Sequence, residues 1–271
     1  MSSLRFTLRA EPDQRLDLSA FTPDRLAGLT EPEIARLPLA TTRQNVSVGD
    51  IFTVQMADPT DIVIEGSSAR FDNVADAMTA GAIRVTGDVG LRAGHRMRGG
   101  KLAIEGDAGP FAASGLRGGQ IAISGNAGPF LAAPGVGEQG GMRGGSVVVR
   151  GNAGSAAATR LRRGTVVIEG DADADAACSM IAGTLIICGH LSAPPARLMR
   201  RGTILLRHPV KPPAGFAPSG RASPVFQALL ASFLRPLSPL AATLAQQTAD
   251  RLAGDLSAEG KGEILMTASG T

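Results

Sequence analysis

The chain repeats one phrase at a fixed spacing, and this repeat restricts its possible folds more than any other feature. Residues 97–111 read MRGGKLAIEGDAGPF, and residues 116–130 read LRGGQIAISGNAGPF. When the copies are aligned on one glycine each, five of the six steps between them are 19 residues long, and the sixth is seven residues longer. A fixed period of this length is typical of a solenoid, in which each copy forms one turn and stacks on its neighbours. The aligned glycines are Gly81, Gly100, Gly119, Gly145, Gly164, Gly183 and Gly202.

Each copy carries the same pattern of apolar residues. Aliphatic residues stand two and four positions after the aligned glycine, and this alternation predicts a short strand with one buried face. A glycine followed by Asp or Asn closes most copies and predicts a turn. A methionine or leucine stands three positions before the glycine, and we interpret this column as core filling rather than as a binding surface. Its members are Met78, Met97, Leu116, Met142, Leu161, Met180 and Met199.

These columns predict a mainly β protein built on a parallel β-helix of about seven 19-residue coils, over residues 61–208. A left-handed β-helix repeats an aliphatic residue about every six positions. Because a 19-residue coil does not divide in that way, we favour the right-handed form. The segment DIVIEG at 61–66 looks like a degenerate coil that precedes the others. Residues 1–60 predict a small α+β cap, and residues 209–271 predict a linker followed by a C-terminal helical tail.

The composition excludes several classes of protein. Net charge is only +3, and Trp and Tyr are absent, so neither a strong phosphate-binding surface nor a base-stacking platform is expected. Two cysteines, Cys178 and Cys188, are too few for a disulfide framework and fit a reducing compartment. The first residues carry no apolar leader, and no apolar run reaches the length of a membrane span. We therefore expect a cytoplasmic protein that binds neither nucleic acid nor membrane.

Three short motifs resemble functional sites, but each lacks a part that the function needs. GVGEQG at 135–140 matches a dinucleotide-binding pattern, yet it lies in the seven-residue insertion and no helix is expected after it. DADAD at 171–175 opens like a calcium loop but lacks the turn glycine and the final glutamate. CGH at 188–190 is the one close Cys/His pair, its spacing is unlike that of a zinc finger, and Cys188 is expected to face outward. We expect no catalytic centre and no metal site in this chain.

Two outward columns are more informative. The first lies two residues before the aligned glycine, is interrupted by Ile181, and consists of Arg98, Arg117, Arg143, Arg162 and Arg200. Stacked at the spacing of neighbouring strands, these guanidinium groups repel one another. Local carboxylates, an acidic partner surface or an anionic ligand could offset the repulsion. We name this column the arginine ladder and put forward the hypothesis that it binds an acidic partner or a polyanion.

The second column lies three residues after the aligned glycine and changes character along the chain. It begins with Arg84, Ala103 and Ala122 and continues as Val148, Val167, Ile186 and Leu205. An exposed aliphatic stripe of this length usually marks an interface. We therefore predict that the last four residues are covered by the C-terminal helices or form an interface with another subunit.

The repeated phrase resembles a domain shared by the C-terminus of the glutamate synthase large subunit and by the C-subunit of formylmethanofuran dehydrogenase. The best copies here are residues 98–109, 117–128 and 143–154. A free-standing length of 271 residues and the ending DRLAGDLSAEGKGEI at 250–264 are similar to the latter. Archaeal members of that family belong to tungsten or molybdenum complexes, and bacterial members belong to a formyltransferase/hydrolase complex. The Ala-, Arg- and Pro-rich composition favours the bacterial complex.

The resemblance implies a right-handed β-helix subunit with structural and assembly roles and no catalytic site of its own. Its expected partners are an amidohydrolase-like, a formyltransferase and a dehydrogenase-related chain. The implied complex moves a formyl group between tetrahydromethanopterin and a methanofuran-type carrier and releases formate, with any metal in another subunit. The glutamate-rich tail of that carrier is an implied partner for the arginine ladder. The alternatives are the C-subunit of a tungsten or molybdenum formylmethanofuran dehydrogenase, a stand-alone adaptor, and a β-helix enzyme that acts alone.

Overall fold

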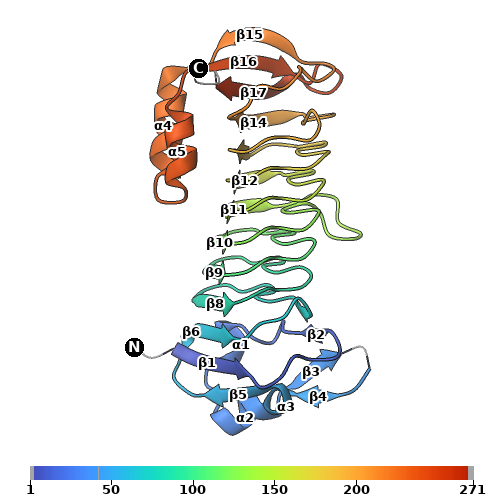
Figure 1. Cartoon of the computed structure of the whole chain (residues 1–271), viewed down its shortest axis with the longest axis vertical. Coiled ribbons are helices and arrows are strands. Elements are labelled where there is room, and N and C mark those ends of the chain that lie inside the picture. The colour runs from blue at the N-terminus through green and yellow to red at the C-terminus, as the bar shows by residue number, and fades with distance from the viewer. Residues whose placement is uncertain (1–2, 42, 268–271) are drawn as a thin grey trace.

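The protein is mainly β, and its longest feature is a mostly parallel sheet that runs the length of the molecule (Figure 1). The structure is a computed structural model that describes residues 3–41 and 43–267. The sheet has 13 strands in the order β15-β16-β17-β14-β13-β12-β11-β10-β9-β8-β6-β1-β5. Its centre is formed by the seven repeats, as β8 (Ala82–Thr86), β9 (Lys101–Ile104), β10 (Gln120–Ile123), β11 (Arg143–Val149), β12 (Arg163–Ile168), β13 (Thr184–Ile187) and β14 (Arg201–Leu206).

Equivalent residues of successive repeats lie side by side. Ile121 pairs with Leu102 on one neighbouring strand and with Val147 on the other, and all three belong to the column two positions after the glycine. A second line of parallel bridges joins equivalent positions of the following turn, as in Ala108↔Ala127. The two inward columns and the Met/Leu column are buried in one continuous core, so the interpretation of the methionines as core is confirmed.

The aligned glycines are required by backbone conformation and by the close approach of the coils. Gly100 has φ +78°, a left-handed conformation that other residues rarely adopt. A Cβ at this position would lie 2.6 Å from the carbonyl oxygen of Gly81 in the preceding coil. The repeated glycine therefore follows from the stacking itself.

The N-terminal cap continues the sheet and has its own core. Strand β6 (Asp58–Glu65) pairs in parallel with β8, which confirms that residues 61–66 form a preceding rung. Strands β1 (Ser3–Leu8) and β5 (Phe52–Gln55) extend this edge, and a second sheet contains β2 (Leu16–Asp17), β3 (Pro38–Thr41), β4 (Val46–Ser47) and β7 (Phe71–Asp72). Three short helices complete the cap: α1 (Pro23–Leu26), α2 (Glu31–Arg36) and α3 (Val48–Ile51). The core is aromatic here, with ring centroids of Phe6, Phe21, Phe52 and Phe71 4.5–6.0 Å apart.

The C-terminal segment contains the two predicted helices, α4 (Pro224–Leu234) and α5 (Pro239–Ala245). It also contains three strands, β15 (Ala217–Arg221), β16 (Ala249–Gly254) and β17 (Lys261–Thr267), so the prediction of a purely helical tail was wrong. Strand β17 pairs in parallel with β14, and Gly262 lies opposite Gly202. The chain thus leaves the stack after β14, forms the helical hairpin, and returns to add one more rung.

Candidate functional site

The arginine ladder lies at the surface in the turns that lead into the strands. All five of its arginines are exposed. Among residues 3–41 and 43–267, no carboxylate lies within 4.0 Å of a ladder guanidinium. The local carboxylates that could have neutralised the ladder therefore do not do so in the described chain, and its charge faces solvent.

The second half of the ladder borders a surface cavity of about 830 Å³. Three ladder residues line it, Arg143, Arg162 and Arg200, and Arg160 from the preceding turn joins them. Glu259 is the one acidic lining residue, and its carboxylate lies 3.4 Å from the guanidinium of Arg201. The remaining lining residues are Gln139, Gly140, Ser179, Ile181, Leu198 and Ala258. Four guanidinium groups against one carboxylate make this cavity suited to an anion with several acidic groups.

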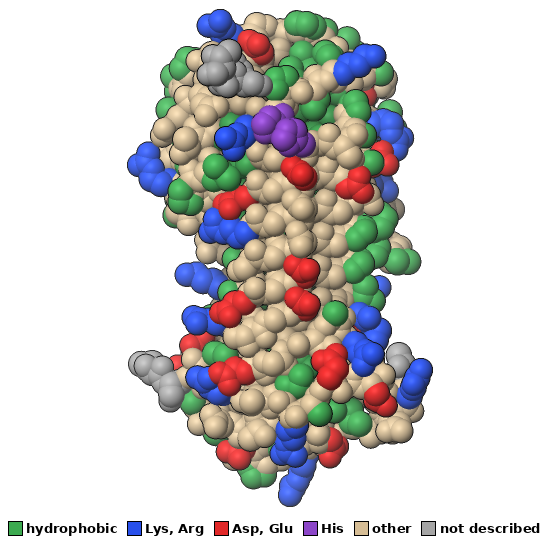
Figure 2. Space-filling model, viewed as in Figure 1, with side chains coloured by type: hydrophobic (Ala, Val, Ile, Leu, Met, Phe, Trp, Pro, Cys, Tyr) green, Lys and Arg blue, Asp and Glu red, His purple; other side chains and the backbone are tan. Residues whose placement is uncertain are grey.

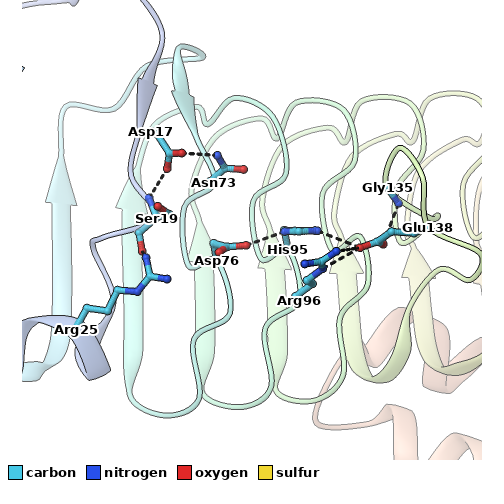
Figure 3. A network of polar contacts seen from close by, with 9 residues as sticks. All are labelled: Asp17, Ser19, Arg25, Asn73, Asp76, His95, Arg96, Gly135 and Glu138. Atoms are coloured by element: carbon cyan, nitrogen blue, oxygen red, sulfur yellow. Dashed lines mark hydrogen bonds and ion pairs between the residues drawn. The ribbon is translucent and has the colours of Figure 1, made fainter. Parts of the chain in front are cut away.

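One wall of the cavity is the inserted loop, residues 134–141, which a network of polar contacts attaches to an earlier coil (Figure 3). The guanidinium of Arg96 donates to the Glu138 carboxylate, with Nε and Nη2 2.8 and 2.7 Å from Oε1. The backbone N–H of Gly135 donates to the other carboxylate oxygen over 3.2 Å. Burial disfavours the charged form of Glu138, but these donors and the nearby charges outweigh it, and the pKa of the carboxyl is lowered.

Asp76, His95 and Ser114 occupy the same position in three successive coils, which brings Asp, His and Ser into one column. His95 Nδ1 lies 2.7 Å from the carboxylate of Asp76, but its Nε2 faces Glu138 at 3.5 Å. Ser114 is fully buried, and its hydroxyl has no hydrogen-bond partner among the described residues. A nucleophilic serine needs a bond to the histidine and access to substrate. This column therefore lacks the geometry of a catalytic triad.

Acidic side chains follow one another along the face drawn in Figure 2, with histidines near its C-terminal end. Each Asp or Asn side chain that ends a strand accepts the backbone N–H one coil further on, as from Asn126 to Asp107 over 2.6 Å. The last acceptor is Asp171, which binds the N–H of His190. DADAD thus belongs to a structural ladder. The rings of His190 and His208 stack 3.9 Å apart, and no three His, Cys, Asp or Glu side chains gather in a metal-binding arrangement within the described ranges.

The aliphatic column of the later coils lies under the chain's own helices. Val148, Val167, Ile186 and Leu205 are buried in a cluster with the inner face of α4 and α5. Their assignment to a subunit interface is thereby corrected, because the helices already cover them. Cys188 also lies in this cluster, outside the core of the coils as expected, and its burial raises the pKa of the thiol to about 12.

The comparisons with known proteins agree with the resemblance to the bacterial complex. No protein-family model matches the chain. A curated relative, the C-subunit of the formyltransferase/hydrolase complex Fhc of Methylorubrum extorquens, is 45% identical over 92 residues, and the match spans about a third of each protein. The crystal structure of the formyltransferase/hydrolase complex FhcABCD from Methylorubrum extorquens with methylofuran contains a chain that this one matches with a TM-score of 0.93. The two are 39% identical, and the match covers 97% of this chain and 99% of that one.

The chain belongs to the Fhc C-subunit family. Members of a subunit family meet other chains, so the outer surfaces of this fold gain importance over its interior. No helix in residues 3–41 or 43–267 combines the length and apolar character needed to cross a bilayer.

For this member of the Fhc C-subunit family, the sequence pattern pointed to the ladder but missed two other parts of the surface. Arg160 escaped notice because it belongs to no repeated column, although the fold brings it beside Arg162 in the cavity. Glu138 was treated only as part of a bulged loop. Its position in the one insertion that breaks the period was the signal that could have identified it.

Proposed function

We propose that the chain is a non-catalytic structural and assembly subunit of a formyltransferase/hydrolase complex. In this proposal the complex transfers a formyl group between tetrahydromethanopterin and a methanofuran-type carrier and releases formate. The transfer and hydrolysis steps belong to formyltransferase, amidohydrolase-like and dehydrogenase-related chains, which also hold any metal. The supporting observation is the match along nearly the whole length to a chain of the FhcABCD crystal structure.

The surfaces of the repeats support a scaffold role. β-Helix enzymes that act alone place carboxylates or histidines at matching heights on neighbouring coils. In the repeats of this chain, the Asp and Asn column accepts backbone N–H groups of the next coil, and the column that contains His95 is closed by Glu138. The remaining columns hold arginine, alanine and aliphatic residues. A rigid stack with charged and apolar outer faces is suited to holding other chains in place.

We further propose that the stack is a right-handed parallel β-helix within residues 61–208, capped by 1–60 and completed by 209–271. Connections between parallel strands of one sheet are right-handed in about 98% of cases, because of strand twist. The parallel registers of β8 to β14 are compatible with this form.

The arginine ladder is proposed to face an acidic partner surface or the glutamate-rich tail of the carrier within the complex, in a cytoplasmic setting. Its five guanidinium groups are exposed and lack a carboxylate partner among the described residues. Pairing them with several carboxylates would relieve their mutual repulsion.

Co-purification tests the scaffold role. The tagged chain, expressed with the other chains of the complex, is isolated under native conditions, and formyltransferase and formate-releasing activities are measured. We expect partner chains and both activities in the purified complex and neither activity in the isolated subunit. An active isolated subunit would contradict a non-catalytic role.

A pair of substitutions tests the ladder. Arg117→Ala combined with Arg143→Ala is expected to reduce retention of the acidic partner or carrier at 150 mM salt by at least about tenfold, which corresponds to about 1.4 kcal/mol. Arg84→Ala removes one exposed arginine from the sheet face and serves as the control. Unchanged assembly and turnover in the double variant would rule out the ladder as a docking surface.

A further inference from the structure

The inserted loop departs from the repeat and projects from the side of the stack (Figure 1). Its residue Val136 has 83% of its surface exposed. Phe130, on the same connection between β10 and β11, is 39% exposed and stacks on Phe111 with ring centroids 4.8 Å apart. Insertions in solenoids usually form loops on the binding face.

The loop is held in place by a carboxylate that is itself nearly buried. The side chain of Glu138 has 16% of its surface exposed and receives hydrogen bonds from Arg96 and Gly135. His95 faces the same carboxylate and is oriented by Asp76 from the other side of its ring. Figure 3 shows these residues reaching the loop from an earlier part of the stack. Fixing a loop in one conformation costs conformational entropy, and this network offsets that cost before any partner arrives.

The same network fixes one edge of the basic cavity. Gln139 and Gly140 follow Glu138 directly and line the cavity together with the arginines. An exposed aliphatic residue and a cavity lined by four arginines are therefore held in a fixed relation by one carboxylate.

We propose that residues 134–141 are a preformed docking element for another protein chain of the complex. Val136 packs against an apolar part of that chain, and carboxylates beside that part enter the cavity lined by Arg143, Arg160, Arg162 and Arg200. The charge of the cavity selects an acidic segment, and Glu138 is a positioning residue that keeps the loop ready to bind. This inference rests on the proposed scaffold function and identifies the surface at which one partner is held.

Two substitutions separate positioning from contact. Glu138→Gln keeps the shape of the side chain but weakens the bonds to Arg96, so hydrogen exchange at residues 134–141 of the isolated full-length chain should become at least about tenfold faster. Val136→Asp changes only an exposed tip and should leave this exchange and the melting temperature unchanged. Both variants should bind the co-expressed partner chains at least about tenfold more weakly, which corresponds to about 1.4 kcal/mol.

Glu33→Gln is the matched control, because Glu33 also holds a local turn, by accepting the N–H and hydroxyl of Thr30, and lies in the cap. It should leave partner binding unchanged. Faster exchange in Glu138→Gln with unchanged partner binding in both variants would overturn the docking proposal while leaving the scaffold function intact. Unchanged exchange would overturn the positioning role of Glu138.

Poly-L-glutamate is the probe for the competing occupant. If it binds the isolated chain through Arg160 and Arg162 while partner binding is insensitive to Val136→Asp, the cavity belongs to a carrier and the protein-docking proposal fails. If no partner chain co-purifies even with the unaltered subunit, the scaffold function itself fails.

Discussion

The outer face of the sheet differs between its early and late coils, although the coils share one backbone. Over β8, β9 and β10 the outward residues are Arg84, Ala103 and Ala122, and no helix covers them in Figure 1. Over β11 to β14 the same column is aliphatic, and α4 and α5 pack on it. The inward columns are buried in both regions. One outward position per coil therefore separates a bare face from a covered one.

The energies explain where the helical layer ends. Burying a valine, leucine or isoleucine side chain contributes roughly 1.5–3 kcal/mol, whereas an alanine offers much less apolar surface. The tip of the hairpin, at Pro236 and Leu237, borders a cavity of about 260 Å³ that Ala103 and Ala122 also line. Ser238, beside this tip, donates to Glu169 over 2.6 Å and attaches the hairpin to the end of β12. The layer stops where the sheet stops offering large apolar side chains.

The strongest way to break this comparison is to place a charge under the helices. Ile186→Asp should lower the free energy of unfolding by at least about 4 kcal/mol, because a buried carboxylate without a partner is costly. Ala122→Asp places the same group in the same column on the uncovered face and should change it by less than about 1 kcal/mol. Urea denaturation of both variants measures the difference. Equal effects would show that the hairpin does not bury the late coils in solution.

Cysteine chemistry provides a second, probe-based comparison. Because burial raises the pKa of Cys188 from 9.0 to about 12, its thiolate at pH 8 should be about a thousandfold scarcer than that of an ordinary thiol. Folding favours the protonated thiol, so this stabilisation is complete below about pH 9 and is lost as pH rises toward 12. Thiol labelling followed by mass spectrometry should modify half-buried Cys178 first. Rapid labelling of Cys188 in the folded protein would contradict the burial.

The two faces of α4 give an intermediate effect. Leu234 is fully buried against the sheet, and Leu234→Ala should cost about 2–5 kcal/mol of unfolding free energy. Its neighbour Phe233 is 53% exposed, so Phe233→Ala should cost less than about 1 kcal/mol in the isolated chain. Chemical denaturation tests the pair. A larger cost at Phe233 would mean that the helix packs in a different orientation.

The smallest effect should be the same in both regions. Asp107 lies in an early coil and Asn152 in a later one, and each accepts a backbone N–H from the next coil. Alanine at either position should lower the free energy of unfolding by about 1 kcal/mol, since both bonds are exposed at the surface. Thermal melts of the two single variants provide the measurement. A clear difference between them would mean that the hairpin influences more than the face it covers.

The sequence predicted the repeated part of the fold because each coil states the same pattern. Glycine, two alternating aliphatic residues and an Asx turn recur in register, and the strands β8 to β14 follow them. The segment VSVGDIFTV predicted a strand–turn–strand, yet helix α3 lies within it, held by a capping box between Ser47 and Asp50. The last rung was missed because it occurs once and far from its neighbour. Comparison of KGEILM at 261–266 with RGTILL at 201–206 could have revealed it.

By itself, the sequence determined the period, the buried columns and the exposed arginines, because a stacked repeat converts spacing along the chain directly into position in space. Only the tertiary structure decided which outward residues stay exposed, where Arg160 and Glu138 lie, and how the chain returns to the stack at β17. Those features depend on contacts between segments that share no period. Such contacts are set by the packing of the hairpin and by the polar network around the inserted loop.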